Sequence, residues 1–494
     1  MTEYSIIPRP ASVCCLTGSF ECPGIPNIAF DSVSDFNNEA RVFADQMRDF
    51  GQMAGSAVIK LIKDDMPLEA YRLKIDADGV SIRAATGAGA YHGLQTLRQL
   101  ILSCYDNGVL KIPCGVIEDY PRFPWRGYML DCSRNFFSTN FIKRMIDALS
   151  LHHVNIFHWH LTDDQGWRLP VNGLPKLTET GAFRREYRHE DRLTGGFYTE
   201  DDIRDIVTFA AARHIDVVPE IDFPGHASAI LAAYPSLGCT GGPYHVEDRF
   251  GVFHDVLCAG NDAVFDFAAS VFDSVVRLFP SQFVHIGGDE VPSTRWAKCP
   301  KCGQRVAKLG LSNHAGLQSW MTSRFASMLK EYGKTVLAWD EVLENTEKFP
   351  LPENLIVMSW RGREGGSKAA LMGHRVIMTP NNEGCYLDYK NADELEEPGR
   401  LSVNTLFQSW SLNLIGQNLN NDAAQFVLGG QGNLWTELIY AGKIAEYMTF
   451  PRICALAEAF WSNDKSKNFE EFKLRLAVHQ ARLDKLGILQ YREI

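Results

Sequence analysis

The sequence lacks the long apolar run that a membrane-spanning helix needs. No stretch of about 18 consecutive apolar residues occurs anywhere in its 494 residues, so we expect no membrane span. It also lacks an excess of basic residues: 49 Lys and Arg stand against 60 Asp and Glu, a formal net charge of -11. Because proteins that bind nucleic acid normally present a basic surface, we expect no nucleic-acid partner.

The first twenty residues, MTEYSIIPRPASVCCLTGSF, lack the two parts of a secretory leader. There is no basic segment, and no apolar core of about 7–15 residues follows. The twelve cysteines are scattered and, without a leader, are most simply reduced thiols. We therefore expect a cytoplasmic protein, although a leader removed before this sequence begins would make it a secreted one instead.

Complete metal-binding patterns are lacking as well. His158 and His160 in HWH lie on one face of a predicted strand, but no HExxH or third-ligand pattern accompanies them. Cys299 and Cys302 in CPKC have the spacing of half a zinc site, but no second CxxC or matching His pair is found. We expect no metal and no cofactor, and the role of this cysteine pair stays open.

What the chain does have, from residue 126 onwards, is a repeated alternation of strand and helix. Helical periodicity is clear at 138–153, 199–214, 261–279 and 314–333. Eight apolar runs of strand length end in polar or aromatic residues, at 127–134, 154–164, 215–226, 283–290, 335–341, 355–362, 375–380 and 426–437. Eight such strands alternating with helices predict an α/β fold of the closed (β/α)8 TIM-barrel type.

The first 120 residues follow a different pattern. Helical stretches at 37–51 and 89–101 lie beside strand-like stretches at 56–63 and 70–85, the second broken by a DADG turn. We expect residues 1–120 to form a small α+β domain, with helices on an antiparallel sheet. Prolines at 121 and 124 suit a boundary, which leaves residues 121–494 for the barrel and its C-terminal helices.

Chemically distinctive residues follow every predicted barrel strand, where enzymes of this fold carry their active sites. Three classes of protein compete to explain them. A metal hydrolase would use the histidines, and a carbohydrate-binding module would use the tryptophans but has no use for so many acids. A glycoside hydrolase uses both, because carboxylates protonate the leaving oxygen and balance charge while aromatic walls hold the sugar ring. Two further stretches, 241–255 and 391–413, are expected to be long loops that shape the rim of the site.

Six motifs then show a resemblance to a known family. HIGGDE, FHWHLTDDQGWR, PEIDFPGHASA, YGKTVLAWDE, CYLDYK and GNLWTE together resemble the β-N-acetylhexosaminidases of glycoside hydrolase family 20. The match covers roughly residues 120–460, and the N-terminal segment resembles the small domain that usually precedes that barrel. The resemblance implies an exo-acting, retaining enzyme that hydrolyses terminal non-reducing β-linked GlcNAc, or GalNAc, from glycans.

The resemblance also implies a mechanism in which the substrate's own acetamide is the nucleophile and forms an oxazolinium ion. Glu290 matches the general acid, Asp289 the residue that orients the acetamide N–H, and Tyr386 a hydroxyl that binds the acetamide oxygen. In this scheme Glu290 is protonated while Asp289 is ionised. Two acids so close together titrate as a coupled pair, which helps to raise the pKa of one of them.

Substrate-binding roles follow from the same resemblance. Three tryptophans match the walls of the sugar pocket: Trp339, Trp360 and Trp435. Three charged residues match the groups that hold the ring hydroxyls: Arg134, Asp388 and Glu437. Asp163 and His226 match a charge pair beneath the general acid that tunes its proton affinity. The sequence leaves open the natural glycan and the oligomeric state.

Overall fold

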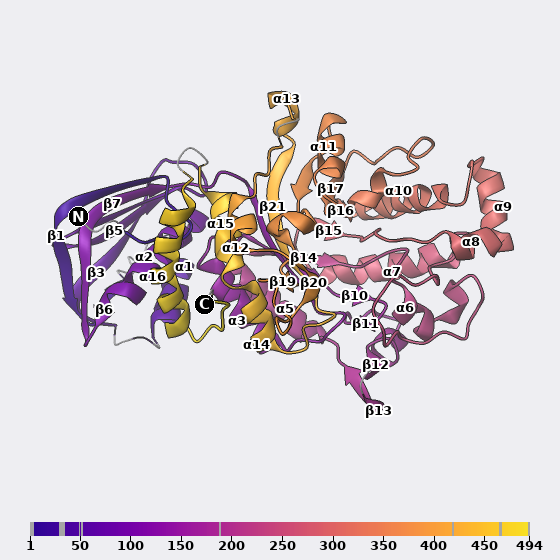
Figure 1. The fold of residues 1–494 in the computed structure, drawn as a ribbon, viewed down its shortest axis with the longest axis horizontal. Coiled ribbons are helices and arrows are strands. Elements are labelled where there is room, and N and C mark those ends of the chain that lie inside the picture. Colours follow the sequence, from indigo (N-terminus) through magenta and orange to yellow (C-terminus); the bar gives the residue numbers. More distant parts are fainter. Residues whose placement is uncertain are drawn as a thin grey trace.

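The computed structural model describes residues 4–28, 35–48, 50, 53–186, 189–416, 419–463 and 467–492. Figure 1 shows an N-terminal sheet at one end of an elongated molecule and a barrel with its covering helices at the other. The barrel is closed and parallel, with the strand order β14-β15-β16-β17-β18-β21-β8-β9. The predicted (β/α)8 fold is thereby confirmed.

The eight barrel strands coincide with the eight predicted apolar runs but are shorter. They are β8 (Trp125–Asp131), β9 (Ile156–His160), β14 (Asp216–Glu220), β15 (Phe283–His285), β16 (Thr335–Trp339), β17 (Leu355–Ser359), β18 (Val376–Met378) and β21 (Val427–Leu434). Because most of the strands stop before the polar ends of their runs, most of the motif residues lie in the loops that follow. This places them at the carboxyl end of the barrel.

Helices cover the outside of the barrel (Figure 1). The four predicted helices are present as α3 (Thr139–Ser150), α5 (Glu200–Ala211), α7 (Ala263–Leu278) and α10 (Gly316–Glu331). Capping residues set the first turns: the Ser138 hydroxyl accepts from the Phe141 amide, and Thr199 and Asp202 form a capping box. After β16 to β18 the helices are shorter, as in η2 (Asp340–Leu343), α11 (Glu364–Leu371) and α12 (Leu406–Ser411).

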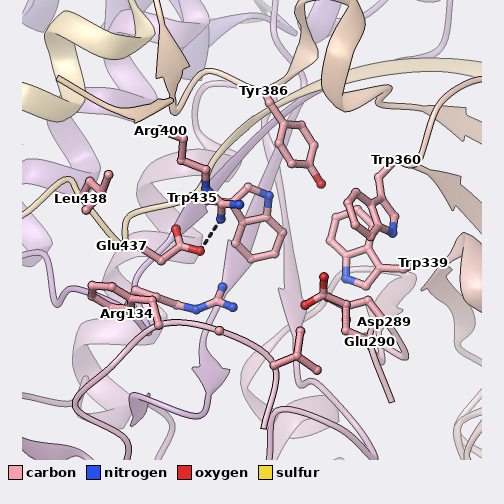
Figure 2. A pocket seen from close by; sticks show the side chains of 13 residues that line it. Arg134, Asp289, Glu290, Trp339, Trp360, Tyr386, Arg400, Trp435, Glu437 and Leu438 are labelled. Atoms are coloured by element: carbon pink, nitrogen blue, oxygen red, sulfur yellow. Dashed lines mark hydrogen bonds and ion pairs between the residues drawn. The ribbon is translucent and has the colours of Figure 1, made fainter. Parts of the chain in front are cut away.

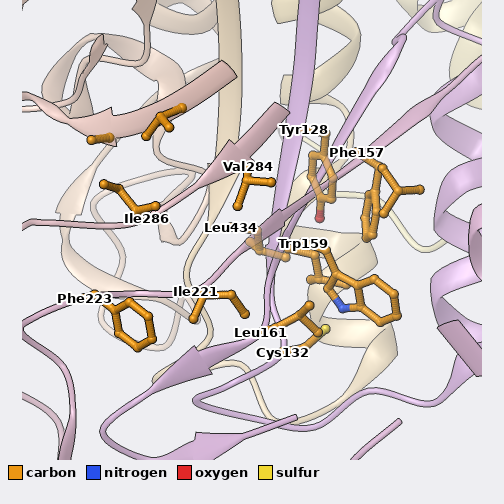
Figure 3. Close-up of a cluster of buried hydrophobic side chains, with 14 of the residues drawn as sticks. Tyr128, Cys132, Phe157, Trp159, Leu161, Ile221, Phe223, Val284, Ile286 and Leu434 are labelled. Carbon is orange, nitrogen blue, oxygen red and sulfur yellow. The ribbon is translucent and has the colours of Figure 1, made fainter. Parts of the chain in front are cut away.

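Alternation along the strands divides the barrel core into two sets of side chains. Tyr128 of β8, Phe157 and Trp159 of β9 and Val284 of β15 belong to the large cluster that packs between strands and helices (Figure 3). The other set fills the barrel interior and includes Met129, Ile156, Val218, Leu337, Ile356, Met358 and Ile377. Three aromatic residues of the predicted site, Trp339, Tyr386 and Trp435, belong to the same interior cluster. The candidate site therefore forms the end of the interior core at the carboxyl ends of the barrel strands.

The N-terminal sheet has seven strands, in the order β1-β7-β4-β5-β3-β2 with β6 paired to β7. The strands are β1 (Ser12–Pro23), β2 (Ile25–Ile28), β3 (Met53–Lys63), β4 (Tyr71–Asp76), β5 (Gly79–Ala84), β6 (Tyr105–Asp106) and β7 (Val109–Asp119). The expectation of an antiparallel sheet is wrong for β3, which pairs in parallel with both β2 and β5. For β2 and β3 the cause is α1 (Asn37–Met47), because a helical crossover returns the chain in the same direction. For β3 and β5 the cause is the intervening strand β4, which runs antiparallel to β5.

Helices from the two ends of the chain join the sheet to the barrel. The C-terminal helix α16 (Phe469–Lys485) packs against α2 (Gly87–Cys104) of the N-terminal region. Arg482 Nε donates to Ser103 Oγ over 2.7 Å, and Lys485 Nζ donates to the Leu102 carbonyl over 2.6 Å. None of the helices in the described ranges is both long and apolar enough to cross a membrane.

Candidate active site

A pocket of about 390 Å³ opens at the carboxyl ends of the barrel strands (Figure 2). Its volume lies near the lower end of the range for small-molecule sites, which suits one sugar ring. Eight of the predicted site residues line it: Arg134, Asp289, Glu290, Trp339, Trp360, Tyr386, Trp435 and Glu437. The remaining lining residues are Phe250, Gly251, Val252, Arg400 and Leu438. Most of the predicted set is therefore brought into one pocket.

The segment after β15 turns sharply at two glycines. Gly287 and Gly288 have φ values of 66° and 93°, in the left-handed region that favours glycine. A Cβ on Gly287 would lie only 1.8 Å from Asp222 Oδ1, and the Gly288 amide donates to that same oxygen over 3.0 Å. The close approach of this turn to Asp222 explains why HIGGDE has two glycines before its acids.

The turn also explains how two adjacent acids reach one pocket. Strand alternation would put Asp289 and Glu290 on opposite faces, but β15 ends at His285. Glu290 has a φ of 48°, an uncommon conformation for a residue other than glycine and a form of backbone strain that clusters at functional sites. Asp289 is 8% exposed whereas Glu290 is exposed, so the two carboxylates meet different environments.

His226 lies between the two acids and a second carboxylate pair. Its Nε2 is 3.6 Å from Asp289 Oδ2 and 3.7 Å from Glu290 Oε2. Its Nδ1 is 3.0 Å from both Asp163 Oδ1 and Asp164 Oδ2. Burial disfavours the imidazolium, but the charges of Asp163 and Asp289 outweigh it and raise the pKa of His226 well above its usual value. The predicted Asp163–His226 pair thus lies beneath the two acids as a buried cation with carboxylate partners.

Asp289 itself is held in a setting that favours its neutral form. Burial raises the pKa of Asp289 well above its usual value, and Asp222 adds to the shift while His226 opposes it. The sequence argument expects an ionised Asp289, so the pocket differs from that expectation. The Asp289 carboxyl shares a hydrogen bond with the Asp222 carboxyl. Among the described residues no amide, hydroxyl or basic side chain donates to its buried Oδ1. A donor supplied by a ligand would meet this oxygen.

A buried network fixes the tryptophan at the base of the pocket. Trp339 Nε1 donates to Glu220 Oε1 over 2.8 Å. The same carboxylate lies 3.0 Å from His158 Nε2, 2.5 Å from His160 Nδ1 and 3.1 Å from His285 Nδ1. The two histidines of HWH therefore converge on Glu220, and the shared carboxylate holds the indole of Trp339 in place.

The other aromatic walls are held by charged or stacked neighbours. Trp360 Nε1 donates to Glu341 Oε2 over 3.0 Å, and its ring stacks on Tyr386 at 6.2 Å between centroids with a 13° interplanar angle. The guanidinium of Arg134 lies 4.8 Å from the centroid of the Trp435 ring. Burial, together with the charge of Asp289, raises the pKa of Glu341 to about 8.

The opposite end of the pocket is built from ion pairs. Arg134 Nη2 lies 2.7 Å from Asp163 Oδ2. Arg400 Nε lies 2.8 Å from Asp388 Oδ2, and its Nη2 pairs with Glu437 (Figure 2). Asp388 therefore lies behind Arg400 and does not line the pocket. Among the described residues, Glu437 Oε2 is buried and has no hydrogen-bond partner.

Arg400 is the functional candidate that sequence reasoning missed. It begins β20 (Arg400–Val403), outside all six motifs, and reaches the pocket because β20 pairs with β19 (Tyr389–Lys390). The rim residues Phe250 to Val252 were also not singled out. Both segments lie within the two loops that are expected to shape the rim. The feature of the sequence that indicates a role in the pocket is therefore their position in these loops and not their residue types.

A (β/α)8 barrel whose end combines adjacent carboxylates with tryptophan walls has the fold and site of a glycoside hydrolase. The chain belongs to glycosyl hydrolase family 20. The model of that family's catalytic domain matches residues 123–464, and the model of its domain 2 matches residues 3–120. The resemblance inferred from the six motifs is thereby confirmed.

Named relatives agree with this assignment. The chain is 39% identical, over 98% of its length, to a β-hexosaminidase of Porphyromonas gingivalis, of which it spans 64%. It is 30% identical, over 99% of its length, to a β-N-acetylhexosaminidase of Cellulomonas fimi, of which it covers 96%. The structure of an exo-β-N-acetylglucosaminidase from Vibrio harveyi in complex with N-acetylglucosamine superposes with a TM-score of 0.90 at 29% identity, covering 99% of this chain and 78% of that one.

Proposed function

We propose that this protein is an exo-acting, retaining β-N-acetylhexosaminidase. It would release terminal non-reducing β-linked GlcNAc, or GalNAc, from glycans. The observation that carries the proposal is a buried Asp289 Oδ1, to which no N–H of the described residues donates, beside an exposed Glu290 in a pocket for one sugar ring. The activities named for the Porphyromonas, Cellulomonas and Vibrio relatives support the substrate class.

In the first step the acetamide oxygen of the substrate attacks the anomeric carbon. Glu290 gives its proton to the glycosidic oxygen as the bond to the leaving group breaks, and a bicyclic oxazolinium ion forms. Asp289 accepts the acetamide N–H and balances the positive charge that develops there. This donor and this charge favour the carboxylate form of Asp289, against the burial that raises its pKa.

In the second step Glu290 takes a proton from water as the water opens the oxazolinium ion. Attack on the face that the leaving group left gives net retention of configuration. The exposure of Glu290 supports this double role, because both the leaving group and the water must reach its carboxyl group. Tyr386, stacked on Trp360, would donate its hydroxyl to the acetamide oxygen and align it for attack.

The rest of the pocket would hold the ring. The three tryptophan walls, Trp339, Trp360 and Trp435, supply apolar contact for the sugar faces and the acetamide methyl group. Glu437 Oε2 can accept a ring hydroxyl, and Arg134 and Arg400 can donate to others. A pocket of this size favours a single terminal sugar over an internal one.

A comparison of two chromogenic substrates tests the proposal. We expect p-nitrophenyl β-GlcNAc to be hydrolysed and p-nitrophenyl β-glucoside to be essentially inert, because the glucoside lacks the acetamide nucleophile. Rapid hydrolysis of the glucoside would contradict substrate assistance. Binding of GlcNAc without turnover of either substrate would instead identify a carbohydrate-binding protein, and activity that EDTA abolishes at once would favour a metal hydrolase.

A further inference from the structure

Four cysteines from three places in the sequence converge in the segments that follow β14 and β15. They are Cys239, Cys258, Cys299 and Cys302, and all four sulfur atoms lie within 4.8 Å of one another. The Sγ–Sγ distances are 3.9 Å for Cys239–Cys302, 3.8 Å for Cys258–Cys299 and 3.6 Å for Cys258–Cys302. Cys258, Cys299 and Cys302 are buried, and Cys239 is half-buried.

We propose that these four cysteines bind one zinc ion. Four sulfurs at a Zn–S distance of about 2.3 Å in a tetrahedron lie about 3.8 Å apart, which the three distances match. A disulfide needs sulfurs about 2.05 Å apart, so none of these pairs is bonded. Binding would convert four thiols and Zn²⁺ into a tetrathiolate complex and release four protons to solvent.

The surroundings of the four cysteines stabilise thiolates. The backbone of Gly260, amide included, packs directly against the Lys301–Cys302 peptide. Cys299 is the N-cap of α9 (Pro300–Leu309) and Cys302 lies in its first turn, where the helix dipole favours negative charge. A Cβ on Gly260 would lie 2.3 Å from the Lys301 carbonyl carbon, so only glycine lets this amide approach the CPKC turn so closely.

This site revises the expectation that the chain holds no metal. Sequence reasoning found only the Cys299–Cys302 half, because the second pair is not a CxxC motif but two cysteines separated by 18 intervening residues. The fold brings the segments that carry Cys239 and Cys258 together. Gly238 and Leu257 form an antiparallel bridge, and the Cys258 amide donates to the Leu237 carbonyl over 2.8 Å. The bridge brings Cys239 and Cys258 to diagonally opposed positions, with their sulfur atoms within 4.8 Å of each other.

The position of the zinc site relative to the pocket indicates what it does. Cys239 and Cys258 close a loop that carries the pocket residues Phe250 to Val252. Cys299 and Cys302 belong to the segment that follows Asp289 and Glu290. A zinc ion that joins the two pairs would therefore fix one rim of the pocket against the loop that carries the acids, without taking part in the chemistry.

Metal content of the purified full-length protein tests the proposal directly, and the result does not depend on the enzymatic activity. We expect one zinc per chain by mass spectrometry of the metals, and less than about a tenth of that in Cys258→Ala and Cys239→Ala. The half-buried Cys239 provides a variant that folds even if the replacement of Cys258 does not. Cys114→Ala, which removes a buried thiol of the N-terminal sheet, should keep its zinc.

Cobalt substitution gives a second readout. The protein loaded with Co²⁺ in place of zinc should show the visible bands of a tetrahedral, thiolate-bound ion, and Cys239→Ala should lose them. Chelation should lower the Tm by at least about 5 °C while kcat in the folded enzyme changes less than about twofold. Iron in place of zinc, no bound metal, or a mass that shows disulfides among these four cysteines would overturn the proposal.

Discussion

The charged residues at the two ends of the pocket differ in how closely they are paired (Figure 2). At the arginine end, Arg134 and Arg400 each have a carboxylate partner within 2.8 Å. At the acid end, Asp289 and Glu290 share His226, whose Nε2 is 3.6 and 3.7 Å from their oxygens. Those distances are too long for hydrogen bonds, so neither acid has the close ion-pair partner that each arginine has.

The difference assigns the two ends to different parts of the reaction. A preformed set of ion pairs meets the sugar in the same geometry in the ground state and in the transition state, so it contributes to binding. Acids without close partners can respond to a charge that appears only in the transition state. We therefore expect substitutions at the acid end to lower kcat and substitutions at the arginine end to raise KM.

The largest expected effect is that of Glu290→Gln, which removes the proposed proton donor. On a glycan substrate with a poor leaving group, kcat should fall by about 10³–10⁴, because general acid catalysis contributes about that much. An activated aryl glycoside, whose leaving group needs little protonation, should lose much less. Steady-state kinetics on the two substrates measure the difference, with the surface variant Glu331→Gln as the matched control. Equal losses on both substrates would contradict the acid role.

Asp289→Asn should have the next largest effect. The amide cannot balance the charge of the oxazolinium ion, so we expect kcat to fall by about 10²–10³ with little change in KM. The loss should be similar for activated and poor leaving groups, since Asp289 acts on the acetamide and not on the glycosidic oxygen. A rise in KM at unchanged kcat would place Asp289 among the binding residues and remove the proposed contrast between the two ends.

The position of the acid end could be predicted from the sequence because it depends on short local patterns. The apolar run before HIGGDE predicts a strand, and the two glycines of the motif favour a sharp turn that places both acids at one end of the barrel. Motif residues at successive strand ends converge because a closed barrel brings all its carboxyl ends together. The same logic correctly joined eight predicted residues into one pocket.

What the sequence could not show depends on contacts between distant loops. Arg400 reaches Glu437 only through the short β19–β20 pairing, which leaves no periodic pattern. Cys239 and Cys258 meet through one isolated bridge. The parallel pairing of β3 likewise depends on what connects the strands, a crossover helix to β2 and the reversed strand β4 to β5, and not on any feature of the strands themselves.

At the arginine end, Glu437→Gln should raise KM about tenfold while kcat changes little. The neutral side chain weakens the pairing with Arg400 and offers a ring hydroxyl a weaker acceptor, which costs about 1–2 kcal/mol of binding. Arg400→Lys should give a similar result, because lysine cannot bridge Asp388 and Glu437 with one planar group. Inhibition by GlcNAc should weaken in parallel. A fall in kcat larger than the rise in KM would assign this end to catalysis.

The smallest expected effect concerns stability and tests the raised pKa of Glu341 at the acid end. The pKa of Glu341, which holds Trp360, is raised to about 8 by burial and by Asp289, from an ordinary value of 4.5. Between these pH values the folded protein binds a proton that the unfolded chain does not, so the free energy of unfolding falls as pH rises from about 4.5 to about 8.

Glu341→Gln keeps an acceptor for Trp360 but removes this titration. The measured quantity is the Tm of the variant minus the Tm of the wild type. Thermal unfolding should show this difference to be about 2–5 °C larger at about pH 8.5 than at about pH 5. The surface variant Glu331→Gln should show no such change. An equal difference between Glu341→Gln and wild type at both pH values would mean that folding does not raise the pKa of Glu341.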